Sequence, residues 1–155
     1  MTGAELKTLR ENLGLTSEWL VKRTGVTQCA LACWEADKAA VPDYVAELLL
    51  SIDALFDATR RALLQTFEQS ASDEIVLMRY KTDQELWHFQ PEFLEARLSA
   101  TSYGALLFRT AKALEYRGAK VKMVYMQPED YLLWLVGKTD CPDMRNEWAG
   151  TQARA

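Results

Sequence analysis

The stretch TQCALACWEADKAAVPDYV, residues 27–45, decides the fold of the first part of the chain. Thr27 is a typical helix N-cap, and the spacing of Ala30, Leu31 and Trp34 puts these three on one buried face of a helix. The opposite face then carries small, uncharged side chains. Pro42 suits the first turn of a following helix, where its missing N–H needs no partner. The stretch therefore predicts a short helix with an uncharged outer surface, followed by a new helix.

Two more helices are predicted upstream of this stretch. The first has leucines at helical spacing ahead of a glycine that would end it: Leu6, Leu9, Leu13 and Gly14. The second is shorter, opens at Thr16 and Ser17, and ends before Gly25, which suits a left-handed turn. Helix, short helix, turn and helix is the plan of a helix-turn-helix.

Apolar residues recur at nearly heptad spacing in residues 45–67, after Pro42. Two interpretations stay open from the sequence. The segment forms two consecutive core helices, or it forms one long or bent helix whose outer half buries a partner subunit.

The second half of the chain changes its hydrophobic period. Short β-branched or alternating runs predict strands at residues 74–80, 93–98 and 120–126. Capping residues, prolines and glycines predict helices from Thr82, from Ser99 to Gly118 and from Pro128 to Gly137. The predicted order β-α-β-α-β-α is typical of a small α/β domain with three strands.

The fold class is therefore expected to be α+β. An all-helical helix-turn-helix domain in residues 1–69 would precede a small α/β dimerisation domain in residues 74–137. Residues 70–73, Ser-Ala-Ser-Asp, break the helical pattern and mark the boundary, whereas residues 138–155 show no period and are expected to be a flexible tail. A sheet this small leaves exposed edges, which a second copy of the chain would cover.

The composition is that of an ordinary globular protein. The 155 residues are 49% hydrophobic and 26% charged, and no apolar run approaches the roughly 18 residues that would span a membrane. An odd number of cysteines, three, at no framework spacing predicts free thiols in a reducing cytoplasm. No export signal and no membrane association are expected.

The formal net charge of −4 argues against a protein that coats nucleic acid non-specifically, because such binding comes from Lys and Arg on phosphates. It does not exclude a specific binder, which needs only a local basic face. An acidic second domain can make the net charge of the whole chain negative while the first domain stays near neutral.

The sequence contains no recognisable catalytic motif. The single histidine, His88, lies between Trp87 and Phe89, where a structural role is the usual one. Neither a nucleophile elbow nor a glycine-rich phosphate loop is found, so neither catalysis nor a cofactor is expected. Cys29 and Cys33 share one helix face, but a structural zinc site usually has four protein ligands, so no metal is expected either. Metal or redox sensing by this pair is the less favoured alternative.

Residues 6–42 resemble the lambda-repressor-like (XRE-type) helix-turn-helix family. The similarity consists of Leu-x-x-Leu-Arg in the first helix, Thr-x-x-x-Leu in the second, and Trp34-Glu35-x-x-Lys38 at the end of the third. More narrowly, CWEADKAAVPDYV (33–45) and RLSATSYGALLFR (97–109) resemble the anti-CRISPR-associated autorepressor group, which joins such a motif to a C-terminal α/β dimerisation domain. The segment from Lys120 onward has no counterpart in this resemblance.

The resemblance implies roles for particular residues. Arg10 and Glu35 would form a bidentate bridge that fixes the angle of the third helix, so that removing either would affect DNA presentation more than stability. Gln28 would bind adenine through two hydrogen bonds, and Cys29, Ala32 and Cys33 would pack against thymine methyl groups. Phosphates would be held by hydroxyls at helix N-termini and by nearby cations: Thr16, Ser17, Thr27, Lys22, Arg23 and Lys38. For the three hydroxyl residues, a role as plain N-caps is equally open.

The sequence thus predicts a transcriptional repressor that acts as a homodimer on an inverted repeat and controls its own operon. One alternative is an antitoxin-like or regulatory protein-interaction module whose helix-turn-helix does not read DNA. A weaker alternative is binding to RNA of its own transcript.

Overall fold

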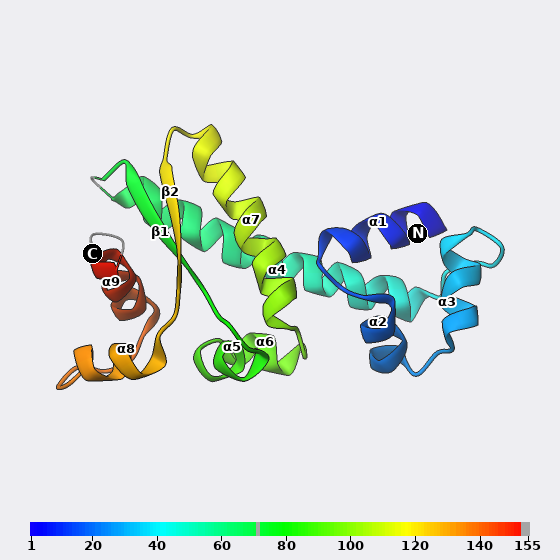
Figure 1. Cartoon of the computed structure of the whole chain (residues 1–155). Coiled ribbons are helices and arrows are strands. Elements are labelled where there is room, and N and C mark those ends of the chain that lie inside the picture. The colour runs from blue at the N-terminus through cyan, green and yellow to red at the C-terminus, as the bar shows by residue number, and fades with distance from the viewer. Residues whose placement is uncertain (71, 153–155) are drawn as a thin grey trace. The chain divides into compact units, whose positions relative to one another are not determined.

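The computed structural model describes residues 1–70 and 72–152 and shows an α+β protein that is mostly helical (Figure 1). The chain forms two compact units, residues 1–59 and residues 60–155, and the boundary falls within a helix. Ala71 in the expected linker and residues 153–155 of the expected tail lie outside the described residues. In the described ranges, no helix is long and apolar enough to cross a membrane.

The first unit is built from three short helices and the first part of a longer one: α1 (Gly3–Asn12), α2 (Ser17–Thr24), α3 (Gln28–Glu35) and α4 (Asp43–Gln69). The predicted leucine stripe is largely confirmed, since Leu6 and Leu13 are buried, and Leu31 and Trp34 of α3 are buried as expected. α3 packs against both α1 and α2. The core of this unit therefore lies beneath α3 and leaves its other face free.

The start of each short helix is fixed by a threonine. The side chains of Thr2, Thr16 and Thr27 each accept a hydrogen bond from the backbone N–H three residues on, at 3.0–3.1 Å. At Thr2 the capping box is complete, because Glu5 accepts from the Thr2 backbone N–H in return. Gly25 ends α2 in the left-handed conformation, with φ 74°, as the sequence predicts.

α4 is one continuous helix rather than two consecutive ones. Its first half buries a regular apolar stripe in the first unit: Val45, Leu49, Ile52 and Phe56. The contact of its outer half with a partner subunit stays a prediction.

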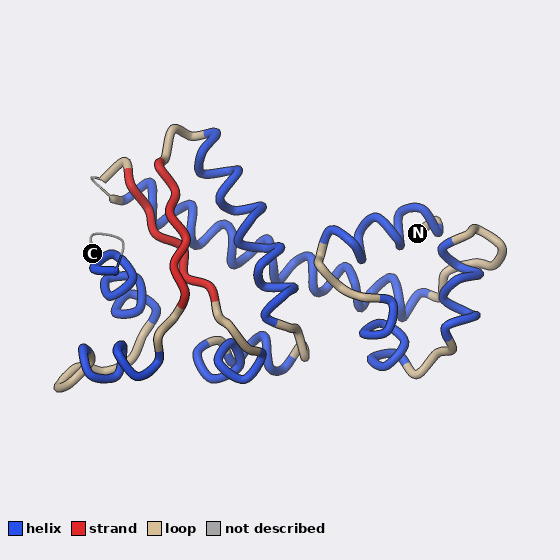
Figure 2. Tube along the Cα trace, in the orientation of Figure 1, coloured by secondary structure: helices blue, strands red, loops and turns tan. Residues whose placement is uncertain are grey.

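The second unit holds a parallel pair of strands, β1 (Glu74–Arg79) and β2 (Lys120–Tyr125), which run in register from Glu74 opposite Lys120 to Arg79 opposite Tyr125 (Figure 2). Parallel strands need a crossover, and α7 (Ala100–Tyr116) forms much of it and packs on both strands. Figure 1 shows the strands between α7 and α9 (Pro142–Gln152), which contacts β1. The other helices are α5 (Asp83–Phe89), α6 (Pro91–Glu95) and α8 (Pro128–Trp134).

The predicted strand at residues 93–98 is wrong, and in the described residues the sheet has two strands instead of three. Pro91 at the first turn starts α6, and Phe93 and Leu98 are both fully buried while Leu94 is exposed. Residues five apart therefore share the buried side, which a strand of period two cannot produce. Arg97 then reverses the chain with φ 54°, and the Leu98 N–H donates to the Phe93 carbonyl.

The expected flexible tail is also wrong for its described part, because it contains the helix α9. Trp148 is 1% exposed, and its ring meets Tyr131 of α8 edge-on at 5.7 Å between centroids. Arg145 is buried as well, donating from Nε to Asp140 at 2.9 Å and from Nη1 to the Phe89 carbonyl. These partners are distant in sequence or aperiodic, so the local pattern could not reveal the helix.

The polar cluster under α9 is completed by the Tyr131 hydroxyl, which donates to Asp140 at 2.5 Å. Burial raises the pKa of Tyr131, and its hydrogen bond to the Asp140 carboxylate raises it further. The pKa of Tyr80 is also raised, mainly by burial. Both phenols therefore remain neutral at physiological pH, and α9 is an integral part of the second unit.

Trp148→Ala is expected to destabilise the second unit by about 3–5 kcal/mol, because it leaves a large cavity under α9. Urea unfolding followed by circular dichroism would measure the loss. Tyr116→Ala is the matched control, since Tyr116 is 95% exposed and its removal should change the unfolding free energy by no more than about 0.5 kcal/mol. Equal stability of the two variants would contradict the packing of α9.

Candidate nucleic-acid interface

The outer face of α3 is exposed and uncharged. Gln28, Cys29 and Ala32 are exposed, and Cys33 is partly buried. The same helix turns Leu31 and Trp34 into the core, so its orientation is fixed by apolar packing. The structure thus places together, on one helix face, the four residues that the resemblance assigns to base contacts.

The hydroxyl residues lie at the N-termini of α2 and α3. Thr16 and Thr27 are exposed, and each is confirmed as an N-cap by the hydrogen bond that its side chain accepts. Ser17 is partly buried in the first turn of α2. Contacts of these groups with phosphate stay predictions, since an N-cap hydroxyl still has its own proton to donate.

Three exposed cations lie close in sequence to α3. Lys22 and Arg23 occupy the last turn of α2, and Lys38 follows the C-terminus of α3. None of the three forms a salt bridge with any residue of the described ranges. Their charges are therefore available to an external anion.

The charge distribution differs from the expected one. Residues 1–59 contain five Lys or Arg and nine Asp or Glu, whereas residues 60–155 contain thirteen of each. The acidic surplus thus lies in the first unit, and the suggestion of an acidic second domain is wrong. On α3 itself the one carboxylate is Glu35, which is engaged by an arginine.

That arginine is Arg10, which is 6% exposed and ties α3 to α1. Its Nε donates to Glu35 Oε1 at 2.7 Å, as the predicted bridge requires. The expected bidentate geometry is wrong, because Nη1 donates instead to the Leu15 carbonyl at 2.8 Å. One guanidinium therefore joins the end of α3 to α1 and to the loop that leads into α2.

A second contact between α1 and the end of α3 was not anticipated from the sequence. The Gly3 N–H donates to Asp37 Oδ1 at 2.6 Å, and Asp37 itself adopts φ 54°. A Cβ on Gly3 would lie 1.9 Å from the Trp34 carbonyl oxygen, so the backbones approach more closely than any other residue would allow. The only sequence signal for this contact was Gly3 itself, a poor helix former in the first turn of α1.

The histidine and the cysteines of the described residues form no reactive or metal-binding cluster. The ring of His88 is exposed and meets Phe89 edge-on at 4.7 Å between centroids. Cys29, Cys33 and Cys141 are free thiols. In the part of the chain that the structure describes, no group of three or more His, Cys, Asp or Glu is arranged to hold a metal ion.

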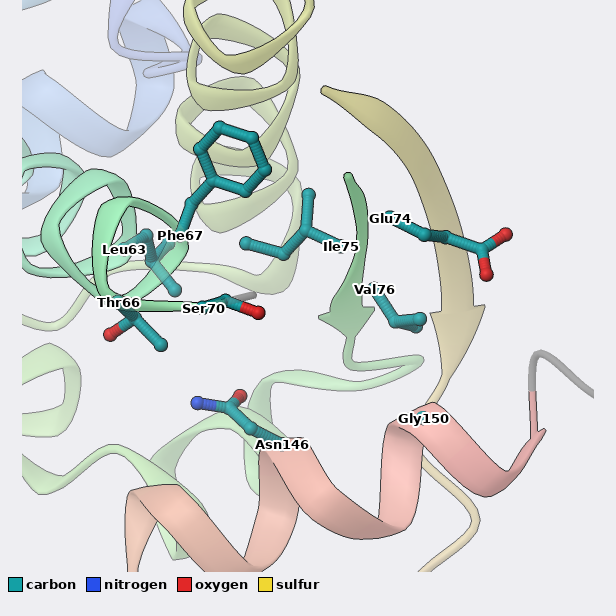
Figure 3. Close-up of a pocket in the computed structure, with 9 residues that line it drawn as sticks. All are labelled: Leu63, Thr66, Phe67, Ser70, Glu74, Ile75, Val76, Asn146 and Gly150. Carbon is teal, nitrogen blue, oxygen red and sulfur yellow. The ribbon is translucent and has the colours of Figure 1, made fainter. Parts of the chain in front are cut away.

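A cavity of about 170 Å³ lies in the second unit between the last turns of α4, β1 and α9 (Figure 3). It is lined by Leu63, Thr66, Phe67, Ser70, Glu74, Ile75, Val76, Asn146 and Gly150. In Figure 3 the Asn146 amide projects from α9 toward α4. The lining is mainly aliphatic and hydroxyl side chains, and no cation or histidine is among the lining residues that the structure describes.

No family model matches this chain, and no curated protein is significantly similar to it. The resemblance to lambda-repressor-like proteins therefore stays a prediction that rests on residues 6–42 and on the geometry described above.

Proposed function

We propose that this protein is a sequence-specific DNA-binding repressor of the lambda-repressor-like type, with α2, the Gly25 turn and α3 as its helix-turn-helix. The observation that carries the proposal is the outer face of α3: it is exposed, has no free carboxylate, and has three unpaired cations nearby in the sequence. A helix that enters a DNA groove needs such a face, because an exposed carboxylate would be repelled by the phosphates.

In this proposal α3 enters the major groove and reads few bases directly. Gln28 binds an adenine edge through two hydrogen bonds. The small side chains of Cys29, Ala32 and Cys33 let the helix approach closely and contact thymine methyl groups. The remaining specificity then comes from the shape and deformability of the DNA.

Phosphate contacts orient the helix. Lys22, Arg23 and Lys38 supply charge, and Thr16, Ser17 and Thr27 supply hydroxyl and backbone donors at the N-termini of α2 and α3. The acidic surplus of the first unit weakens non-specific affinity, so the protein should release random DNA at modest salt.

The proposed active form is a homodimer that presents two copies of α3 about 34 Å apart to an inverted repeat. The second unit supports self-association, because parallel sheets are normally covered on both faces and β2 leaves Met123 about half exposed. Binding over its own promoter would then block the polymerase.

A protein-interaction module of the antitoxin type is the second candidate. It is favoured by the acidic surplus of residues 1–59 and by the small, uncharged face of α3, which could equally dock a neighbouring protein. RNA binding by the same cations is a further alternative within this proposal.

The decisive experiment is selection of the purified protein on random-sequence duplex DNA, followed by footprinting on its own upstream region. We expect an inverted repeat, and Gln28→Ala should weaken binding about 5- to 150-fold per half-site, with relaxed preference at one adenine in each half-site. Lys38→Ala should weaken binding to all sequences alike and lower the salt slope by about two, because the homodimer loses one phosphate contact in each half-site. Gln65→Ala, on an exposed position of α4, is the control with unchanged binding.

If the selection enriches no sequence, the repressor proposal is overturned. If a co-purifying protein then loses binding to both Gln28→Ala and Lys38→Ala, the interaction module is supported instead. Competition of the selected duplex with the transcript leader would identify RNA binding.

A further inference from the structure

A second cavity, of about 240 Å³, lies in the second unit at the carboxyl ends of the two strands. It is lined by Arg79, Tyr80, Lys81, Ala100, Thr101 and Tyr125. Because Arg79 and Tyr125 are opposite each other at the last position of the register, both strands end at the cavity. In open parallel sheets, ligands bind outside these carboxyl ends, where loops diverge and leave a crevice.

The lining of this cavity is cationic. Arg79 and Lys81 contribute positive charge, and no acidic residue is among the lining residues that the structure describes. The Arg79 guanidinium lies over Gly104 of α7, where a Cβ would come within 2.5 Å of Nη1. It forms no ion pair or side-chain hydrogen bond within the described ranges, although it is partly buried. A partly desolvated guanidinium without a partner is costly, so the geometry favours an anion there.

Lys81 is oriented by neutral groups. Its Nζ donates to Gln127 Oε1 at 2.8 Å and lies 5.9 Å from the centre of the Tyr125 ring. Neither contact neutralises the ammonium charge, and both hold it near the cavity wall. A second unneutralised cation therefore faces the same space as Arg79.

The nearby carboxylates and the N-terminus of α7 are already engaged. Asp83 accepts from the Ala100 backbone N–H at 2.7 Å, and Ser99 accepts from the Ser102 N–H. Glu85 accepts from the Lys81 backbone N–H at 2.8 Å. The anion site therefore depends on the two cationic side chains rather than on the helix terminus.

We propose that this cavity binds a small phosphate monoester, with Arg79 and Lys81 on the phosphate. Arg binds phosphate through paired N–H donors, and the lysine adds a point charge. The cavity, of about 240 Å³, is larger than a phosphate group alone needs. The Tyr125 side chain, 51% exposed, and Thr101 offer a wall and a hydroxyl for the organic part of the ligand.

The test is isothermal titration of the full-length protein with three probes: inorganic phosphate, glycerol 3-phosphate and adenosine 5′-monophosphate. We expect saturable binding of at least one monoester, tighter than that of phosphate. Arg79→Met should weaken it about 10- to 100-fold, and Lys81→Met should weaken it less. Lys7→Met, which removes the same charge from an exposed position of α1, should leave it unchanged.

Gly104→Ala provides a variant that keeps every charge. Its new methyl group must push the Arg79 guanidinium aside, so the substitution should weaken binding of the monoester as well. The protein should stay folded, because the far end of the arginine side chain is flexible and can move. Thermal melting of each variant would verify the fold. The proposal is overturned if no monoester binds saturably, if phosphate binds as tightly as the monoesters, or if folded Lys81→Met and Gly104→Ala bind as the native protein does.

Discussion

Glu35→Ala is expected to destabilise the first unit by about 3–5 kcal/mol, because it leaves the Arg10 charge buried without its carboxylate. Arg10 is 6% exposed, and the Glu35 side chain is 14% exposed, so water cannot replace the lost partner easily. The Leu15 carbonyl remains as an acceptor, which places the expected loss nearer the lower end of this range. The sequence predicts a larger effect on DNA presentation than on stability, and the burial of Arg10 adds the expectation of a large effect on stability.

Glu11→Ala is the matched control for this prediction. It removes the same charge, and Glu11 also approaches the Arg10 guanidinium, at 3.6 Å, but its side chain is 57% exposed. Its loss should therefore cost no more than about 1 kcal/mol in urea unfolding. A double variant, Arg10→Met with Glu35→Leu, should recover most of the stability, since it removes both charges together. Equal effects of Glu35→Ala and Glu11→Ala would refute the buried bridge.

The parts of the fold that the sequence predicts well are those set by local chemistry. Thr16 and Thr27 begin helices because a hydroxyl can accept from an N–H three residues on, and Gly25 ends one because it tolerates positive φ. Leu31 and Trp34 are buried because their spacing matches the helical period. These rules need no knowledge of the rest of the chain.

The failures have a tertiary cause. Phe93 and Leu98 are both buried, but their burial is decided by tertiary packing, such as the edge-on contact of the Phe93 ring with Tyr103 of α7, and not by an alternating period. α9 is held by Trp148, which meets Tyr131 of α8, and by Arg145, which donates to Phe89 of α5 and to Asp140 in the loop before α9. Neither contact leaves a periodic trace in the sequence, so a strand was predicted in one place and a tail in the other.

The candidate site shows the same division. Exposure of Gln28, Cys29 and Ala32 follows from the helical period, and the family resemblance predicts the Arg10–Glu35 pair. The cationic cavity around Arg79 could not be predicted, because it joins residues 79–81, 100–101 and 125 through the crossover of the sheet. Sites at the ends of parallel strands exist only once the register is formed.

Gly3→Ala is expected to destabilise the first unit by about 1–3 kcal/mol or more, although alanine is the better helix former. The new Cβ would lie 1.9 Å from the Trp34 carbonyl oxygen and 3.0 Å from the carbonyl carbon. Both are backbone atoms, which cannot rotate away as a flexible side chain would. The Gly3 N–H would also move from Asp37, with which it forms a 2.6 Å hydrogen bond.

The sign of the change in unfolding free energy distinguishes this clash, which destabilises, from helix propensity, which would stabilise the alanine variant. Gly150→Ala in α9 is the matched control, because a Cβ there meets no atom within 4 Å and should stabilise its helix by up to about 1 kcal/mol. If Gly3→Ala were also stabilising, α1 could not approach the end of α3 as closely as described. If it is destabilising, urea unfolding should show a lower midpoint, because α1 can relieve the clash only by moving away from the end of α3. DNA affinity would then fall as well, since α1 and the end of α3 together set the orientation of the proposed reading helix.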